Sequence, residues 1–221
     1  LLSFLFFLVI FGACISDRQP ASAVDYSLLV NPFIGTDFTG NTYPGAQAPF
    51  GMVQLSPDNG LPGWDRISGY YYPDSTIAGF SHTHLSGTGA GDLYDISYMP
   101  VTLPYREAEA PLGIHSKFRH SDEEASAGYY RVLLKDYNIN VELTATERCG
   151  IQRYTFPKAQ SAVFLNLKKA MNWDFTQDSH IEVVDSCTIQ GYRFSDGWAR
   201  GQRVFFRTRF SKPFRSSEID T

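Results

Sequence analysis

The chain has 221 residues, of which 43% are hydrophobic and 19% charged, and its formal net charge is -4. These values fit a globular protein of one large or two small domains, and with no run of Lys or Arg they argue against nucleic acid as a partner. Aromatic residues reach 15%, and the chain contains 18 Gly and 12 Pro. This balance favours an all-β protein with many turns.

The first residues, Leu1 to Ala13, are almost wholly apolar. The run is too short to span a bilayer comfortably and fits the core of a signal peptide. The segment FGAC, which ends at Cys14, resembles a bacterial lipobox, although Phe11 stands where Leu is usual. We therefore expect residues 1–23 to be a signal peptide or a lipoprotein tether. The protein is expected to be exported to the periplasm or, through a lipid anchor at Cys14, to the outer membrane or cell surface.

Residues 24–104 are rich in turns, and within them Gly63–Asp92 reads GWDRISGYYYPDSTIAGFSHTHLSGTGAGD. Gly allows the backbone to approach a ligand closely, and the faces of aromatic rings suit the apolar faces of sugars. His and Asp supply hydrogen bonds, proton carriers or metal ligands. We interpret this segment as one wall of a binding cleft.

His82 and His84 are the most chemically suggestive pair in this segment. On a strand, side chains two residues apart point to the same face, so the pair could bind a metal with a carboxylate from Asp65, Asp92 or Asp95. The alternative is that they contact a ligand or organise a Gly-rich loop. We favour this alternative, because the chain has no HExxH motif and no Cys/His cluster.

Tryptophan–aspartate pairs occur three times in the chain. Trp64 and Asp65 follow a predicted turn, where they could form a sugar-stacking platform with a hydroxyl acceptor or simply pack the domain edge. Trp173 and Trp198 also have Asp neighbours, but they lie between predicted strands, and we interpret them as loop anchors. The three consecutive tyrosines Tyr70–Tyr72 are expected on a strand with alternate rings buried.

Short segments rich in β-branched and aromatic residues follow one another from about residue 128, separated by polar or Gly/Pro turns. They predict an antiparallel β-sandwich for residues 24–221. The best helix candidate is a short turn at Ser121–Ala127, which Ser121 could cap. The predicted strands are Tyr129–Leu134, Asn140–Thr146, Ile151–Phe156, Ala162–Leu167, His180–Val184, Thr188–Phe194 and Arg203–Phe210.

Three cysteines are present. If Cys14 carries lipid, Cys149 and Cys187 remain. Export would permit a disulfide between them, and two buried free thiols are an equal alternative. Their spacing fits no zinc pattern.

Two long motifs resemble the N-terminal domain of glycoside hydrolase family 92, the exported bacterial α-mannosidases. They are VNPFIGTDFTGNTYPGAQAPFGMVQLSPD, and GWD followed by SGYYYPDSTIAGFSHTHLSGTGAGDLYDISYMP. The resemblance runs from about Asp25 to the end of the chain and is densest between Val30 and Pro100.

The resemblance implies an N-terminal β-sandwich that packs on a larger C-terminal (α/α)-barrel catalytic domain. It implies removal of terminal α-mannose from N-glycans or mannans, with inversion and with calcium as cofactor. In the family, the catalytic carboxylates and most calcium ligands belong to the C-terminal domain, so we assign no catalytic acid, base or metal ligand here and expect the chain to be a fragment. By motif position, the substrate-binding or supporting residues carried over are Trp64, Asp65, His82, His84, Gly87 and Gly89.

Two positions depart from the family pattern: Asn41 and Tyr71 stand where members often have His. Either change could alter a loop contact or the linkage preference. Two other functions remain open beside that of an α-mannosidase domain. One is a free-standing carbohydrate-binding module without hydrolytic activity, and the other is a metal-dependent enzyme built on His82 and His84.

Overall fold

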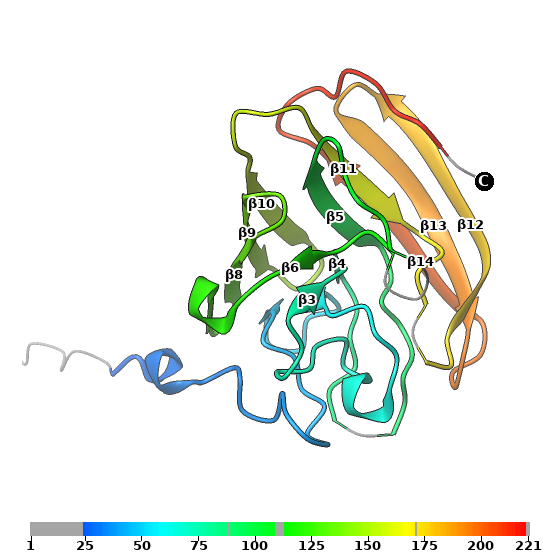
Figure 1. The fold of residues 1–221 in the computed structure, drawn as a ribbon. Coiled ribbons are helices and arrows are strands. Elements are labelled where there is room, and N and C mark those ends of the chain that lie inside the picture. The colour runs from blue at the N-terminus through cyan, green and yellow to red at the C-terminus, as the bar shows by residue number, and fades with distance from the viewer. Residues whose placement is uncertain (1–23, 88, 109–112, 171, 220–221) are drawn as a thin grey trace, which may run out of the picture.

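The computed structural model describes residues 24–87, 89–108, 113–170 and 172–219 (Figure 1). The expected signal peptide or tether and the lipid anchor at Cys14 lie outside the described residues. Within those ranges, helix is limited to three short 3-10 turns, at Tyr26–Leu29 (η1), Trp64–Arg66 (η2) and His120–Asp122 (η3). None of the helices found there is long and apolar enough to cross a membrane.

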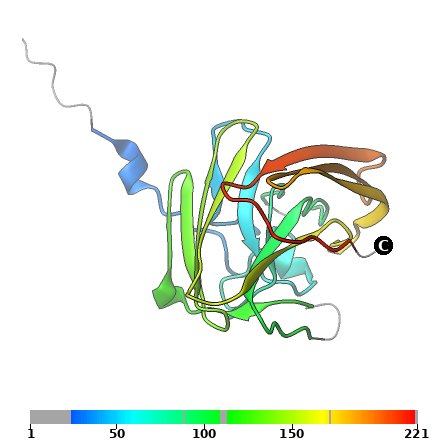
Figure 2. The same ribbon diagram turned by 90° about the horizontal axis from the view of Figure 1, so that it is seen from above.

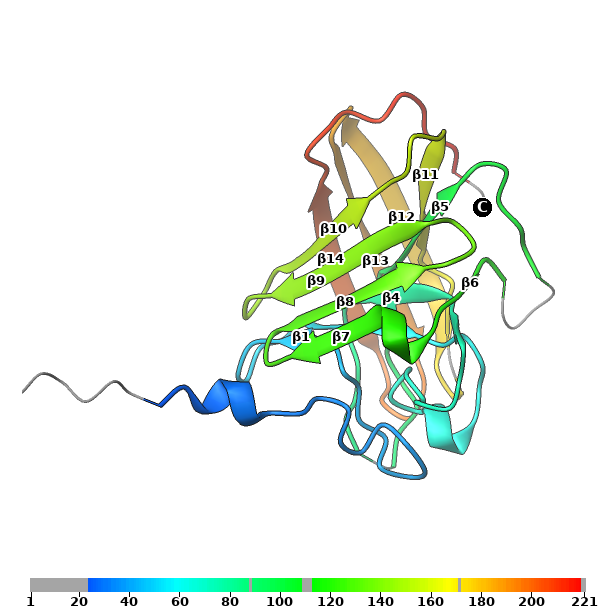
Figure 3. The ribbon, with the colours of Figure 1, turned by 60° about the vertical axis from the view of Figure 1, so that its left-hand side comes forward.

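All paired strands of the described residues are antiparallel, and they form four sheets (Figures 1 and 3). The central sheet has the order β1 (Ala46–Gln47), β2 (Gln54–Asp58), β4 (Gly79–Ser81), β5 (Ser97–Thr102), β11 (Ser161–Asn166). A four-stranded sheet has the order β10 (Gly150–Thr155), β9 (Ile139–Ala145), β8 (Tyr129–Leu134), β7 (Glu123–Ser126). A three-stranded sheet contains β12 (Phe175–Asp185), β13 (Thr188–Asp196) and β14 (Gln202–Arg209), and β3 (Thr76–Ile77) pairs with β6 (Ser116–Lys117).

The central sheet is covered on both faces, which gives three layers (Figure 2). Alternate residues of a strand point to opposite faces, and in β5 Met99 joins one core whereas Tyr98 joins the other. The larger core packs the central sheet on the four-stranded sheet, with Leu55 and Phe80 facing residues such as Val141. The smaller core packs the other face on the three-stranded sheet, where the Tyr98 hydroxyl lies 2.5 Å from that of Thr208.

The antiparallel β-sandwich is confirmed, and the three-stranded sheet adds a layer that the sequence did not predict. Each of the seven predicted strands is present, most within one residue of the expected limits. The largest difference is in β12, which begins at Phe175 instead of His180 because a register irregularity between Thr176 and Asp178 lets pairing with β13 continue, and β13 itself ends two residues later than expected, at Asp196.

Two local predictions were wrong at least in part, for a shared reason. The turn predicted at Ser121–Ala127 is limited to η3, which Ser121 does not cap, because residues 123–126 form β7, and Tyr70–Tyr72 lie outside any strand. The buried carboxylate of Glu123 accepts hydrogen bonds from the hydroxyls of Tyr70 (2.8 Å) and Tyr130 (2.7 Å). These long-range bonds outweigh the local preferences of both segments.

The two cysteines of the described residues are not bonded to each other. Cys149 is exposed and Cys187 is partly buried, and both are free thiols. The disulfide is therefore not formed in this structure, and Cys149 is not a buried core thiol either.

Candidate functional site

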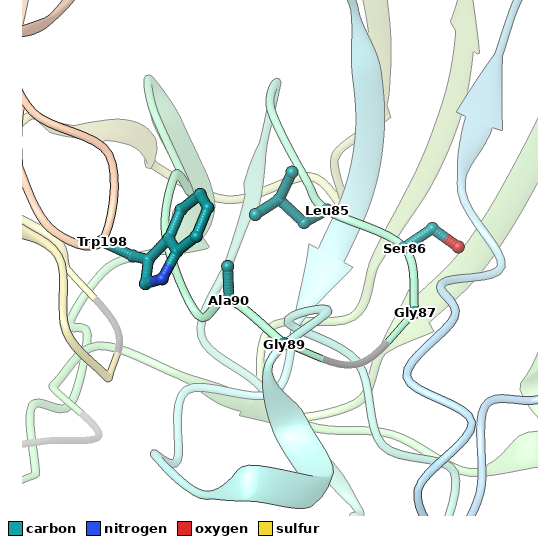
Figure 4. A pocket seen from close by; sticks show the side chains of 6 residues that line it. All are labelled: Leu85, Ser86, Gly87, Gly89, Ala90 and Trp198. Carbon is teal, nitrogen blue, oxygen red and sulfur yellow. The ribbon is translucent and has the colours of Figure 1, made fainter.

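The Gly-rich loop that follows β4 lines a hollow at the molecular surface. Leu85, Ser86, Gly87, Gly89 and Ala90 form its floor, and the indole of Trp198 stands beside Ala90 (Figure 4). The hollow has a volume of about 280 Å³. An adjoining hollow of about 410 Å³ shares Gly89 and Trp198 and is completed by Trp173 and Gly197.

All three tryptophans of the chain gather at this edge and are unusually exposed. Trp198 is 75% exposed, Trp64 51% and Trp173 46%. Trp64 and Trp173 meet edge to face, with ring centroids 5.8 Å apart. Because a large aromatic side chain gains most from burial, three exposed indoles around one loop mark a binding surface.

Asp92 fixes the turn that carries Trp198. Its buried carboxylate accepts the backbone N–H of Trp198 on Oδ1 (3.0 Å) and the backbone N–H of Ala199 on Oδ2 (2.8 Å). A Cβ at Gly197 would collide with this carboxylate, so glycine is needed for the close approach. The Gly-rich loop and the indole above it are therefore held as one unit.

Asn172 joins the other two tryptophan loops. Its side-chain oxygen accepts the N–H of Gly63, next to Trp64, at 3.0 Å, and the residue itself precedes Trp173. A Cβ on Gly91 would lie only 2.7 Å from the Cβ of Asn172, so the Gly-rich loop packs directly on this residue. The loops of Trp64 and Trp173 thus share one anchor.

A buried ion-pair network lies beneath these loops. Arg193 of β13 donates to Asp95 (2.6 Å) and Asp174 (3.0 Å), and its side chain is completely enclosed. Burial raises the pKa of Asp174 above its ordinary value, although Arg193 opposes that shift. Because Asp174 directly follows Trp173, this network sets where that indole stands.

His84 does not reach the hollow. Its side chain is buried, with Nδ1 donating to the carbonyl of Gln54 (2.6 Å) and Nε2 lying 2.8 Å from Asp58 and 3.0 Å from the Ser81 hydroxyl. Burial acts to raise the pKa of Asp58, but nearby Lys169 and His84 outweigh it and lower that pKa. A catalytic triad places hydroxyl and carboxylate on opposite ring nitrogens, whereas here both contact Nε2, so the cluster is a structural support for the loop.

His82 also faces the protein interior. Its Nδ1 lies 2.8 Å from the carbonyl of Ile96, and its ring packs against Tyr98 with centroids 5.8 Å apart. Burial lowers its pKa below the ordinary value, which favours the neutral ring. β4 ends at Ser81, so the two histidines are not on a strand, and their Nδ1 atoms face separate carbonyls.

The six predicted site residues therefore separate into two groups. Gly87 and Gly89 line the hollow, and Trp64 and Asp65 lie nearby on η2. His82 and His84 lie behind the loop as supports. Within the described ranges, no group of three or more His, Cys, Asp or Glu is arranged to hold a metal ion.

Trp173 and Trp198, interpreted from sequence as loop anchors, are instead the walls of the site. Their repeated pairing with Asp was the available indication, since Asp174 pairs with the buried Arg193 and Asp196 accepts the backbone N–H of Gly201. One departure from the family pattern also lies here: the backbone carbonyl of Asn41 accepts the N–H of Gly87 at 2.7 Å.

Comparison with known proteins identifies the family of this chain. Residues 29–221 match the model of the glycosyl hydrolase family 92 N-terminal domain. The chain belongs to glycosyl hydrolase family 92. A family 92 α-mannosidase from Bacteroides thetaiotaomicron, solved alone and with mannoimidazole, is 38% identical over 86% of this chain, with a TM-score of 0.81.

Other family 92 relatives are more distant. An inverting family 92 mannosidase from the same bacterium is 27% identical over 88% of the chain, with a TM-score of 0.69. A protein of Arthroderma benhamiae described as an uncharacterized secreted glycosidase is 28% identical over 138 residues, or 58% of this chain. The chain spans only 26% of either mannosidase and 17% of the fungal protein.

Proposed function

We propose that this chain is the N-terminal module of an exported exo-α-mannosidase and that its Gly-rich loop helps to hold the terminal mannose. The observation that carries the proposal is the hollow between Gly87, Gly89 and Trp198, in a family 92 domain whose relative binds mannoimidazole. Glycine backbone allows a sugar to approach closely, and indole faces suit its apolar face. Export is supported by the secreted description of the fungal relative.

We further propose an inverting reaction on N-glycans or mannans. Support comes from the family 92 relative that is named an inverting mannosidase. Inversion needs a general acid and a general base far enough apart to seat a water. We place both carboxylates in a C-terminal catalytic domain that packs on this one. The buried Asp58, Asp92, Asp95 and Asp174 hold loops and ion pairs, so none is assigned a catalytic role.

Calcium dependence is the third part of the proposal. Among the described residues, no group of three or more His, Cys, Asp or Glu is arranged to hold a metal ion. We therefore place the calcium ligands in the same C-terminal domain and derive no step through the ion. The contribution of this chain is to bind and orient the sugar and to shape the wall of the cleft.

The test is an assay of the longer protein encoded by the continuing reading frame. We expect it to release mannose from α-mannosides, to lose that activity in EDTA and to regain it with calcium. The purified chain ending at Thr221 should show no turnover. Calcium-dependent turnover by that shorter chain would contradict the placement of the catalytic groups and calcium ligands in another domain. An inactive longer protein would contradict the mannosidase function.

A free-standing carbohydrate-binding module remains the second candidate, because three exposed indoles are themselves a stacking surface. That function predicts mannose affinity in the chain ending at Thr221. The mannosidase proposal predicts little or none, since half of the cleft is missing there. Titration calorimetry with α-mannosides separates the two.

A further inference from the structure

The three-stranded sheet β12–β13–β14 is the outermost layer on one side of the molecule (Figure 2). Its inner face packs on the central sheet through residues such as Val204 and Phe206, so the alternate residues of each strand point outward. Strand pairing arranges these outward residues in three rows across the sheet. The rows are Asp178, Phe194 and Arg203; His180, Tyr192 and Phe205; and Glu182, Gln190 and Arg207.

The charges on this outer face are separated by strand. The acidic residues Asp178 and Glu182 lie on β12, and the basic residues Arg203 and Arg207 lie on β14; all four are exposed. Among the described residues, no ion pair involves any of these four charges. The face thus carries an acidic column and a basic column, with the side chains of β13 between them.

The middle strand holds both columns in place. Tyr192 donates its hydroxyl to Asp178 (3.1 Å), and the side chain of Gln190 donates to Glu182 (2.9 Å). Gln190 also accepts from the guanidinium of Arg207 at 3.2 Å. Each carboxylate keeps one oxygen outside these bonds. The four charges are therefore positioned before any partner arrives, which lowers the entropy lost on association.

This charge pattern is complementary to itself. If a second copy stacks face to face about a two-fold axis parallel to β13, each β12 lies opposite the β14 of the other copy. Asp178 then faces Arg203 of the second copy, and Glu182 faces its Arg207. A two-fold axis across the strands would instead place acid on acid and base on base, which costs several kcal/mol. Packed sheets commonly keep their strands within about 30° of each other, so the first arrangement is also an ordinary one.

We propose that the outer face of β12–β13–β14 is the interface of a dimer of two copies of this protein, related by a two-fold axis parallel to β13. The inference does not depend on the mannosidase function. In such an isologous interface, one face supplies both complementary surfaces. Trp173 precedes β12 and Trp198 lies between β13 and β14, so this axis leaves both hollows at the same end of the dimer.

The size of the face sets the strength that we expect. β13 has nine residues, and three strands of that length cover roughly 400 Å². A standard interface buries about 800 Å² per partner. We therefore expect a weak, reversible dimer with a Kd in the micromolar range.

The test is sedimentation equilibrium of the longer protein between about 1 µM and about 100 µM, a range that brackets such a Kd. Arg203→Glu with Arg207→Glu makes both columns acidic, and Asp178→Arg with Glu182→Arg makes both basic. We expect each double variant alone to raise the Kd at least tenfold, because like charges then meet. An equimolar mixture of the two should restore the dimer, since the acidic columns of one variant then face the basic columns of the other.

Control variants separate this interface from a general effect of charge. Arg148→Glu with Lys158→Glu makes the same change in net charge in exposed turns of the four-stranded sheet, and should leave the Kd unchanged. Arg203→Gln with Arg207→Gln removes the attraction without adding repulsion, so it should weaken the dimer less than the Glu variant does. Thermal unfolding shows whether each variant is folded.

Three results would overturn the proposal: an unmodified protein that stays monomeric throughout, a dimer that both charge reversals leave unchanged, or folded variants that fail to associate when mixed. If a reversed variant does not fold, an unchanged Kd in Arg203→Gln with Arg207→Gln would overturn it instead. All these experiments measure mass and not turnover. A failure of the dimer is therefore distinct from a failure of the mannosidase function.

Discussion

Trp64 is the residue for which exposure and position most directly predict a binding role. Half of its surface is exposed, and it touches Trp173 only through a ring edge, so little stability depends on it. In the longer protein, we expect Trp64→Ala to raise KM or weaken inhibitor binding by about tenfold while the free energy of unfolding changes by less than about 1 kcal/mol. Trp64→Phe is the matched control. Unchanged kinetics in Trp64→Ala would remove this residue from the cleft wall.

His82 predicts a pH dependence of stability. Burial lowers its pKa in the folded state below the ordinary value of about 6.5, so the unfolded chain binds more protons as the pH falls through that value. The contribution of the neutral His82 ring to the free energy of unfolding is therefore fully present above about pH 7, and it is lost as the pH falls through the folded pKa. We expect the unfolding temperature to fall as the pH drops below about 6.5, and His82→Gln to flatten that fall.

The exposed His180 provides a control for removing one histidine. If His180→Gln flattens the pH dependence as much as His82→Gln does, the assignment to His82 is wrong. Asp58 affects stability at a lower pH. Its pKa is lowered in the folded state, so its contribution to the free energy of unfolding is lost only as the pH falls below about 4. The two effects can therefore be separated along one titration.

At the scale of single residues, the sequence indicated the Gly-rich loop and Trp64, but not that Trp173 and Trp198 line the same site. Gly87 and Gly89, carried over from the family motif as binding or supporting residues, line the hollow. Trp198 could not be placed in the same way, because its position depends on Asp92, which is 106 residues away in the chain. The histidines attracted attention for their chemistry, yet tertiary hydrogen bonds assign them to the support behind the loop.

Among the elements, β13 connects the three-stranded sheet to the site through Arg193. This guanidinium pairs with Asp95, which follows the Gly-rich loop, and with Asp174, which immediately precedes β12. We expect Arg193→Ala to destabilise the domain by roughly 3–5 kcal/mol, because two carboxylates would be left buried without a cation. Chemical denaturation measures the loss.

Arg203→Ala is the matched control for that variant. Arg203 lies on the exposed face of β14 above the ring of Phe194, and its removal should cost less than about 1 kcal/mol. Similar losses for the two arginines would contradict the special role of the buried network. Arg193→Lys should fall between them, since it keeps the charge but not the two-pronged contact.

The strands of the second half were predictable because they are rich in β-branched and aromatic residues, and some of them, such as β9, also alternate apolar and polar residues. The strands of the first half are mostly shorter, with only two residues in β1 and in β3. Their pairing is decided by distant partners and by turns, which a local pattern does not contain. The third layer was missed for the same reason, because alternation shows that a strand is half-buried but not which sheet covers it.

On the scale of the whole molecule, the segment before β2 carries a concentration of exposed apolar side chains. Phe38 and Phe50 are among the most exposed, and both have positive φ, 51° and 57°, which is costly for a bulky residue. The fold thus accepts strain while leaving these rings in water. The same segment also exposes Leu28, Leu29, Ile34 and Met52.

We expect this surface to make the purified chain self-associate, because large exposed apolar patches mark interaction sites. Light scattering should show a mass that rises with concentration, and the double variant Phe38→Ser with Phe50→Ser should reduce it. Ile151→Ser, which removes an exposed apolar side chain from β10, is the control. A monodisperse monomer at all concentrations would show that the segment needs no covering partner.

The central claim is that the loops of this chain hold the mannose while another domain cleaves the bond. The structure of the longer protein with mannoimidazole bound tests it most directly. We predict that the sugar ring contacts the backbone of the Gly-rich loop and the indole of Trp64 or Trp198, with acidic groups of the second domain on its other side. A ring bound without any contact to these loops would contradict the account.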